Sequence, residues 1–98
     1  MVYYVAEIVS QYPALRNSAD KLFSLINVDE NNEITVSFRD VRGITHSFAA
    51  QYDTNKKISK KKISEVDMNE NVVLMFKLLG KERHINTIKS DKIYTLHI

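Results

Sequence analysis

Three adjacent residues with hydroxyl or imidazole side chains stand where a helix is expected to begin. Thr45, His46 and Ser47 follow a polar turn and precede the apolar Phe48. Hydroxyl groups accept hydrogen bonds from the unpaired amides of a first helical turn, so we predict a helix start near His46. A helix start also carries partial positive charge, which favours an anion or a phosphorylated side chain there. Two interpretations stay open: a phosphate-sensing docking site, or helix capping for stability alone.

The three histidines give little support for catalysis or metal binding. A histidine base or nucleophile needs an orienting partner, and no motif fixes Asp40 or Asp53 against His46. His84 and His97 lie far apart in the sequence, with no HxH or HExxH spacing. With only two glycines the chain has no glycine-rich phosphate loop. We therefore expect no catalytic residue, cofactor or metal, and predict that the protein is not an enzyme.

A basic stretch over residues 56–62 contains five lysines in seven residues. Such a run could neutralise the phosphates of a nucleic acid and release counterions. It has no interleaved aromatic residue to stack on bases, and lysines also protect exposed strand edges from unwanted pairing. A solvated loop is the preferred interpretation, and a small nucleic-acid-associated protein is the alternative function. The residues of that alternative are Lys56, Lys57, Lys60, Lys61 and Lys62.

The elements that must position these residues begin with predicted strands. Alternating apolar residues over residues 34–38 predict a buried central strand that leads into the turn. Residues 2–9 and 63–68 are predicted as two further strands, and alternation over residues 93–98 predicts a terminal one. Gly43 is expected to supply a positive φ angle in the turn.

Three helices are predicted between these strands. Apolar spacings of four, three, one and three from Leu15 to Ile26 give the first helix one apolar face. The second is expected to be short, because its pattern fades at Asp53. The third follows Asn69, a good N-cap residue, and is expected to end at Gly80 or to fray on through Lys81 to His84. Apolar groups cover most of its circumference, so it is either buried or partly committed to a partner.

The order β-α-β-α-β-α-β predicts one α/β domain over residues 1–98, with a sheet of about four strands and about three helices. Ligands gather beyond the carboxyl ends of the strands in such sheets, where residues 38–47 would lie. The composition agrees, since 44% hydrophobic and 27% charged residues fit a globular fold.

Composition also limits the functional classes. The absence of cysteine excludes disulfides, thiol nucleophiles and thiolate metal sites. No signal-peptide pattern is recognisable at the N-terminus, and no apolar run approaches the roughly 18 to 20 residues of a membrane span. We therefore expect a cytoplasmic protein with no membrane partner. The net charge of +2 does not by itself imply a nucleic-acid partner.

Three segments match the pattern of a known family in order and spacing. They are YPALRNSADKLFSLI, ITVSFRDVRGITHSFA and ISEVDMNENVVLMFKLL, and the match extends over roughly residues 12–79. With a core of Ser47, Phe48 and Ala49, they resemble the STAS-like domain of unknown function, a compact relative of the STAS domains of anti-sigma-factor antagonists. The resemblance implies a STAS-like fold and a regulatory protein–protein interaction module. It also implies a protein partner, an anti-sigma or histidine-kinase-like ATPase.

The antagonists carry an Asp-Ser-Ser-Gly segment whose first serine is phosphorylated. By position, Thr45 stands at the aspartate, His46 at that serine, Ser47 at the second serine and Phe48 at the glycine. The acidic residue common in the central strand of the family falls at Ser37. If phosphorylation occurs, we therefore predict it on Ser47 or Thr45.

The leading prediction is a non-enzymatic module that docks on a protein partner through the turn and the helix start. The apolar third helix and the terminal strand also leave a homodimer open. The predicted partner-binding residues are Gly43, Ile44, Thr45, His46, Ser47 and Phe48.

Overall fold

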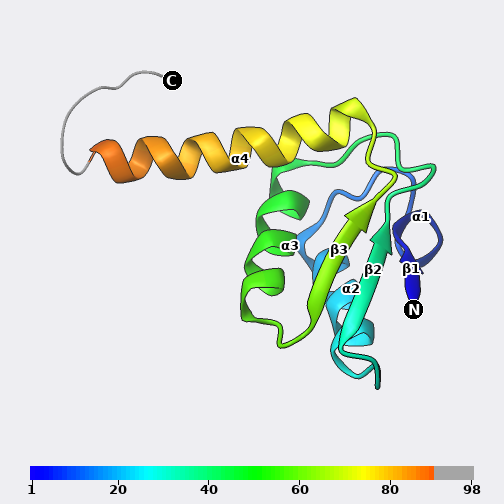
Figure 1. Cartoon of the computed structure of the whole chain (residues 1–98). Helices are drawn as coiled ribbons and strands as arrows, with labels where there is room; N and C mark the ends of the chain where they lie inside the picture. The colour runs from blue at the N-terminus through cyan, green and yellow to red at the C-terminus, as the bar shows by residue number, and fades with distance from the viewer. Residues whose placement is uncertain (90–98) are drawn as a thin grey trace.

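A parallel sheet of three strands forms the centre of the computed structural model, which describes residues 1–89 (Figure 1). The central strand pairs on both sides, in the order β1-β2-β3. Strands that run parallel need crossover connections, which explains why helices lie between each strand and the next. The strands are β1 (Val2–Tyr4), β2 (Glu33–Ser37) and β3 (Lys62–Val66).

Four helices accompany the sheet within residues 1–89. They are α1 (Val5–Ile8), α2 (Arg16–Asn27), α3 (His46–Ile58) and α4 (Glu70–Lys89). Helices α2 and α3 connect successive strands and pack against each other. Because both crossovers step the same way across the sheet, they cover the same face. Helix α4 passes over the end of α3 and then projects away from the sheet (Figure 1).

The core lies between the sheet and these helices. Ile34 and Val36 of β2, and Phe38 just after it, are buried on the helix side. The Tyr52 ring lies at the centre, with centroids 5.8 Å from Phe38 and 5.5 Å from Phe76 of α4. The other buried apolar residues of the helices are Val5, Ala19, Leu22, Phe23, Ile26, Phe48, Ala49, Val72 and Leu79.

The opposite face of the sheet is not covered by a helix in the described part of the chain. Val2, Tyr4 and Val66 are exposed there, beside the small hydroxyl residues Thr35 and Ser64. Both faces of a parallel sheet are usually covered. The small side chains of this face fit its partial exposure to solvent.

The predicted α/β class with alternating strands and helices is confirmed, but the four-stranded sheet is not. The described residues form three strands, and residues 93–98 lie outside them. The first strand is shorter than predicted, because the register of Tyr4 with Ser37 already reaches the end of β2. From Val5 the chain instead turns into α1, closed by a 2.8 Å bond from the Val9 amide to the Val5 carbonyl.

Two helices are longer than predicted. The polar half of α3 continues to Ile58, since Lys57 pairs with Asp53 four residues earlier, at 3.5 Å, and Gln51 bonds to Asn55. Helix α4 passes through Gly80 and ends at Lys89. Gly80 is not in the left-handed conformation that ends many helices, and strong helix formers follow it in the sequence.

Candidate functional site

The turn after β2 stands at the carboxyl edge of the sheet and leads directly into α3, as predicted. It first closes tightly, with the Val41 amide donating to the Phe38 carbonyl at 3.0 Å. Asp40 takes the positive φ angle, 66°, and no glycine among residues 1–89 does so. The expectation for Gly43 is therefore wrong: aspartate tolerates the left-handed region better than most residues, so this turn needs no glycine.

The turn is held in place by two neighbouring segments. From the loop before α2, the Gln11 carbonyl accepts the Arg42 amide at 2.8 Å and the Pro13 carbonyl accepts the Thr45 amide at 3.2 Å. From the loop after β3, the Asn69 side-chain amide donates to the Val41 carbonyl at 2.8 Å. The loop between α1 and α2, the turn after β2 and the loop after β3 therefore meet here, and their bonds hold the backbone of the turn.

Thr45 is the N-cap of α3, as the hydroxyl pattern predicted. Its Oγ1 accepts from the Phe48 amide at 3.1 Å and donates to the Ala14 carbonyl at 2.6 Å. The hydroxyl therefore works both as donor and as acceptor in holding the helix start to the loop before α2. The capping interpretation is confirmed for this residue.

The six predicted partner-binding residues divide into a surface and a core group. Thr45, His46 and Ser47 are exposed. The Phe48 side chain is fully buried beside Tyr52, and Ile44 is only 9% exposed. Phe48 and Ile44 therefore anchor the segment rather than face a partner. Gly43 is partly buried, and a Cβ atom built on it would meet no atom within 4 Å.

Asn69 is an anchor whose second role the sequence did not reveal. Its Oδ1 accepts from the Val72 amide at 3.0 Å, which confirms the predicted N-cap of α4. Its Nδ2 group meanwhile binds the candidate turn. Nearby, the buried Ser37 hydroxyl donates to Asp67 Oδ2 at 3.0 Å. This bond ties the end of β2 to the loop after β3.

The lysine run does not form one continuous basic surface. Lys56 pairs with Glu65 at 2.9 Å, and Lys57 pairs with Asp53. Lys61 Nζ donates to the carbonyl oxygens of Asp29 and, at 2.8 Å, of Asn31. Two of the run's lysines lie in the last turn of α3 and one opens β3, so the expected solvated loop is only its middle part. The exposed members Lys60 and Lys62 remain available to an external anion.

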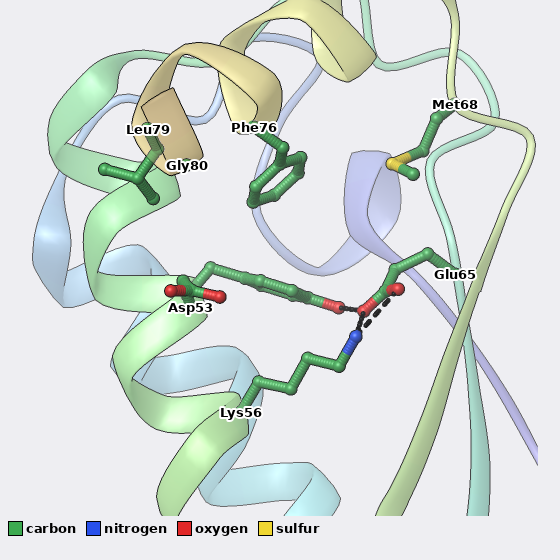
Figure 2. A pocket seen from close by; sticks show the side chains of 8 residues that line it. Asp53, Lys56, Glu65, Met68, Phe76, Leu79 and Gly80 are labelled. Carbon is green, nitrogen blue, oxygen red and sulfur yellow. Dashed lines mark hydrogen bonds and ion pairs between the residues drawn. The ribbon is translucent and has the colours of Figure 1, made fainter. Parts of the chain in front are cut away.

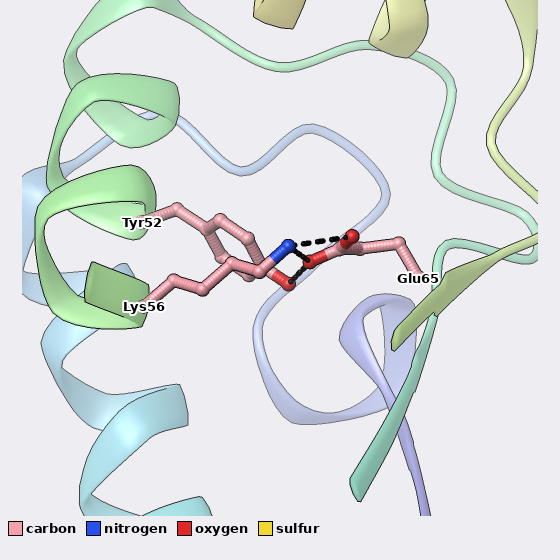
Figure 3. A network of polar contacts seen from close by, with 3 residues as sticks. All are labelled: Tyr52, Lys56 and Glu65. Atoms are coloured by element: carbon pink, nitrogen blue, oxygen red, sulfur yellow. Dashed lines mark hydrogen bonds and ion pairs between the residues drawn. The ribbon is translucent and has the colours of Figure 1, made fainter. Parts of the chain in front are cut away.

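A hollow of about 240 Å³ lies between α3, β3 and α4, and sequence reasoning missed it (Figure 2). Tyr52, Lys56 and Glu65 form a polar network inside it (Figure 3). The Tyr52 hydroxyl donates to Glu65 Oε2 at 2.7 Å, and Lys56 Nζ donates to Oε1 at 3.0 Å. Glu65 pairs with Val36 and faces the helices, at a position of β3 where an apolar residue is expected. This charged residue was the signal in the sequence that could have indicated the hollow.

Burial raises the pKa of the Tyr52 hydroxyl, and the neighbouring Glu65 charge and hydrogen bond raise it further. The phenol therefore stays protonated and acts as a donor that ties α3 to β3. Its partner carboxylate is already neutralised by Lys56. The network therefore links α3 to β3 and stabilises the fold. Among the described residues no group of three or more histidine or acidic side chains is placed to hold a metal ion.

The chain matches no protein-family model, no curated protein and no solved structure. Within residues 1–89, none of the helices combines the length and apolar character needed to cross a membrane.

Proposed function

We propose that this protein is a non-enzymatic regulatory module of STAS type, which binds a protein partner through the exposed start of α3. The observation that carries the proposal is an exposed helix start held by hydrogen bonds to neighbouring loops: Thr45, His46 and Ser47 face solvent between the buried anchors Ile44 and Phe48. A surface already fixed in its bound conformation loses little entropy on binding. The resemblance supplies the partner class, an anti-sigma or histidine-kinase-like ATPase.

Phosphorylation of Ser47 would regulate this surface. Ser47 is exposed in the first turn of α3, where amides without helical partners favour added negative charge. Thr45 is the weaker candidate, because its hydroxyl already bonds to Ala14 and Phe48. Phosphorylation there would break both bonds and remove the cap. We therefore narrow the predicted modification site to Ser47.

The test compares variants in affinity capture with the native-cell ATPase candidates. Ser47→Asp and His46→Ala alter the helix start, while Ser24→Asp places the same new charge on an exposed helical serine of α2. We expect loss of capture for the first two variants and none for the third. Equal capture by all three, or no partner at all, would contradict the docking surface. Intact mass spectrometry of protein from the native cell then tests for the phosphate separately.

The nucleic-acid alternative rests on the exposed Lys60 and Lys62. The internal pairing of Lys56, Lys57 and Lys61 reduces the charge available to a phosphate backbone. Titration with DNA and RNA at two salt concentrations separates the two proposals, because phosphate contacts weaken steeply with salt. Absence of binding at low salt removes this alternative.

A further inference from the structure

The free edge of β3 offers an unpaired set of backbone groups. The Lys62 amide donates to Asn32 at 2.8 Å, and the Val66 carbonyl accepts from Phe38 at 3.0 Å, so both residues bond towards β2. Backbone groups alternate in direction along a strand. The N–H and C=O groups of Ile63 and Glu65 therefore point outward from the sheet as described. An edge of this kind is a template for another strand.

The hollow described above opens beside this edge. Its apolar walls come from Tyr52 of α3, from Met68, and from Phe76 and Leu79 of α4 (Figure 2). An added strand places every second side chain on the helix side of the sheet, level with this hollow. Asp53, Lys56 and Glu65 also line the hollow, and their charges are paired within the chain. The edge and the apolar walls therefore suit a strand that adds no charge and has one apolar face.

Residues 93–98 have that character. Their sequence, IYTLHI, carries no acidic residue, lysine or arginine, and Tyr94, Leu96 and Ile98 alternate with more polar neighbours. We propose that this segment of a second copy of the chain adds as a fourth strand to the free edge of β3, with Tyr94, Leu96 and Ile98 over the hollow.

The reach of the chain favours a second copy over the same one. Helix α4 is 20 residues long, about 30 Å; it begins beside the end of β3, packs over the end of α3 with its first half, and projects away from the sheet with its second half (Figure 1). From Lys89 to Ile93 the chain spans at most about 14 Å. Ile93 therefore falls well short of β3 in its own chain while α4 stays straight. In the proposed dimer, α4 of one copy projects towards the other copy, so that residues 93–98 of the first reach the β3 edge of the second.

Exchange of residues 93–98 between two copies gives a closed dimer, with no edge of β3 left for a third copy. Each copy gives one segment and receives one, so a twofold dimer satisfies both free edges with the same contacts. The projecting helix also keeps an apolar stripe: Leu74 and Leu78, four residues apart, are both 51% exposed. A second copy brought alongside α4 would cover this stripe.

The experiment measures mass and amide exchange on the full-length protein. Light scattering after gel filtration gives the number of chains, and NMR hydrogen exchange follows the amides of Ile63, Ser64, Glu65 and Val66. Leu96→Asp charges the face proposed to cover the hollow, and Thr95→Asp is its matched control on the opposite face. We expect a dimer in which all four amides are protected. We expect Leu96→Asp to lose the dimer mass and the protection of Ile63 and Glu65, but not that of Ser64 and Val66, and Thr95→Asp to retain all of them.

Each other outcome overturns the inference. A monomer with protected Ile63 and Glu65 amides would mean that the strand comes from the same chain. A dimer in which these two amides exchange freely would mean that the copies meet elsewhere. A monomer with free exchange would leave β3 an open edge. Equal effects of Leu96→Asp and Thr95→Asp would refute the assignment of the apolar face.

Discussion

Replacing Thr45 by alanine tests whether the candidate site is held by its cap. The substitution removes the bond from the Phe48 amide and leaves the Ala14 carbonyl without its donor. Loss of an N-cap costs about 1 kcal/mol, within a range of about 0.5–2. The bond from Thr45 to the Ala14 carbonyl is exposed, and water can replace it in part. Its loss therefore costs less than the roughly 0.5–1.5 kcal/mol of a typical hydrogen bond. We therefore expect a total loss of about 1–2 kcal/mol in the free energy of unfolding.

Urea unfolding at equilibrium, followed by circular dichroism, measures this loss, and thermal unfolding checks it. A loss of 1 kcal/mol corresponds to a fall of about 4–8 °C in Tm for a domain of this size. Thr45→Ser keeps the hydroxyl and should recover most of the stability. Ser47→Ala, at an exposed position in the same helical turn, should change it by less than about 0.5 kcal/mol. Equal stabilities for Thr45→Ala and Ser47→Ala would refute the assignment of Thr45 as the anchoring cap.

Three further predictions concern the surrounding structure. Tyr52→Phe removes the 2.7 Å bond to Glu65 but keeps the ring, so the free energy of unfolding should fall by about 1–3 kcal/mol in urea unfolding; no change would contradict the tie between α3 and β3. The hydrogen bond to Asp29, with burial and the Asp29 charge, raises the pKa of Tyr3 from 10.0 to about 12. The contribution of this bond to the free energy of unfolding is therefore complete below pH 10 and is lost as the pH rises towards 12. Asp29→Asn should lower this pKa in a tyrosinate absorbance titration and weaken the pH dependence of stability in that window; an unchanged titration would contradict the bond. Gly43→Ala should leave the free energy of unfolding unchanged or raise it by up to about 1 kcal/mol, because the new Cβ meets no atom within 4 Å and the φ angle is not positive. Thermal unfolding measures this, and a clear fall in Tm would show that the turn needs glycine.

The sequence predicted those parts of the fold that depend on local patterns. The alternation of Ile34, Val36 and Phe38 located the central strand, and the hydroxyl of Thr45 located the start of α3. Both signals need only neighbouring residues. The prediction that Phe48 belongs to the docking surface was wrong, because its side chain is buried beside Tyr52, four residues along the same helical face.

Other features depend on partners distant in the sequence. The length of β1 is set by where β2 ends, and the extension of α3 by pairs such as Lys56 with Glu65, nine residues apart. Lys61 finds its acceptors in the loop after α2, which no charge pattern along the run indicates. Local periodicity indicates which face of a helix or strand is apolar, but the residue at which the element ends depends on tertiary contacts.

The helix start of α3, which we propose as the docking surface, and the lysine run differ in how tertiary contacts hold them. The backbone of the helix start is held by Gln11 and Pro13 on one side and Asn69 on the other, while the side chains of His46 and Ser47 stay exposed. Three loops would have to move together to displace it. The lysines, in contrast, use much of their charge to hold the protein together. Among the residues predicted to bind, His46 and Ser47 are exposed, and the backbone that carries them is held by neighbouring loops on both sides.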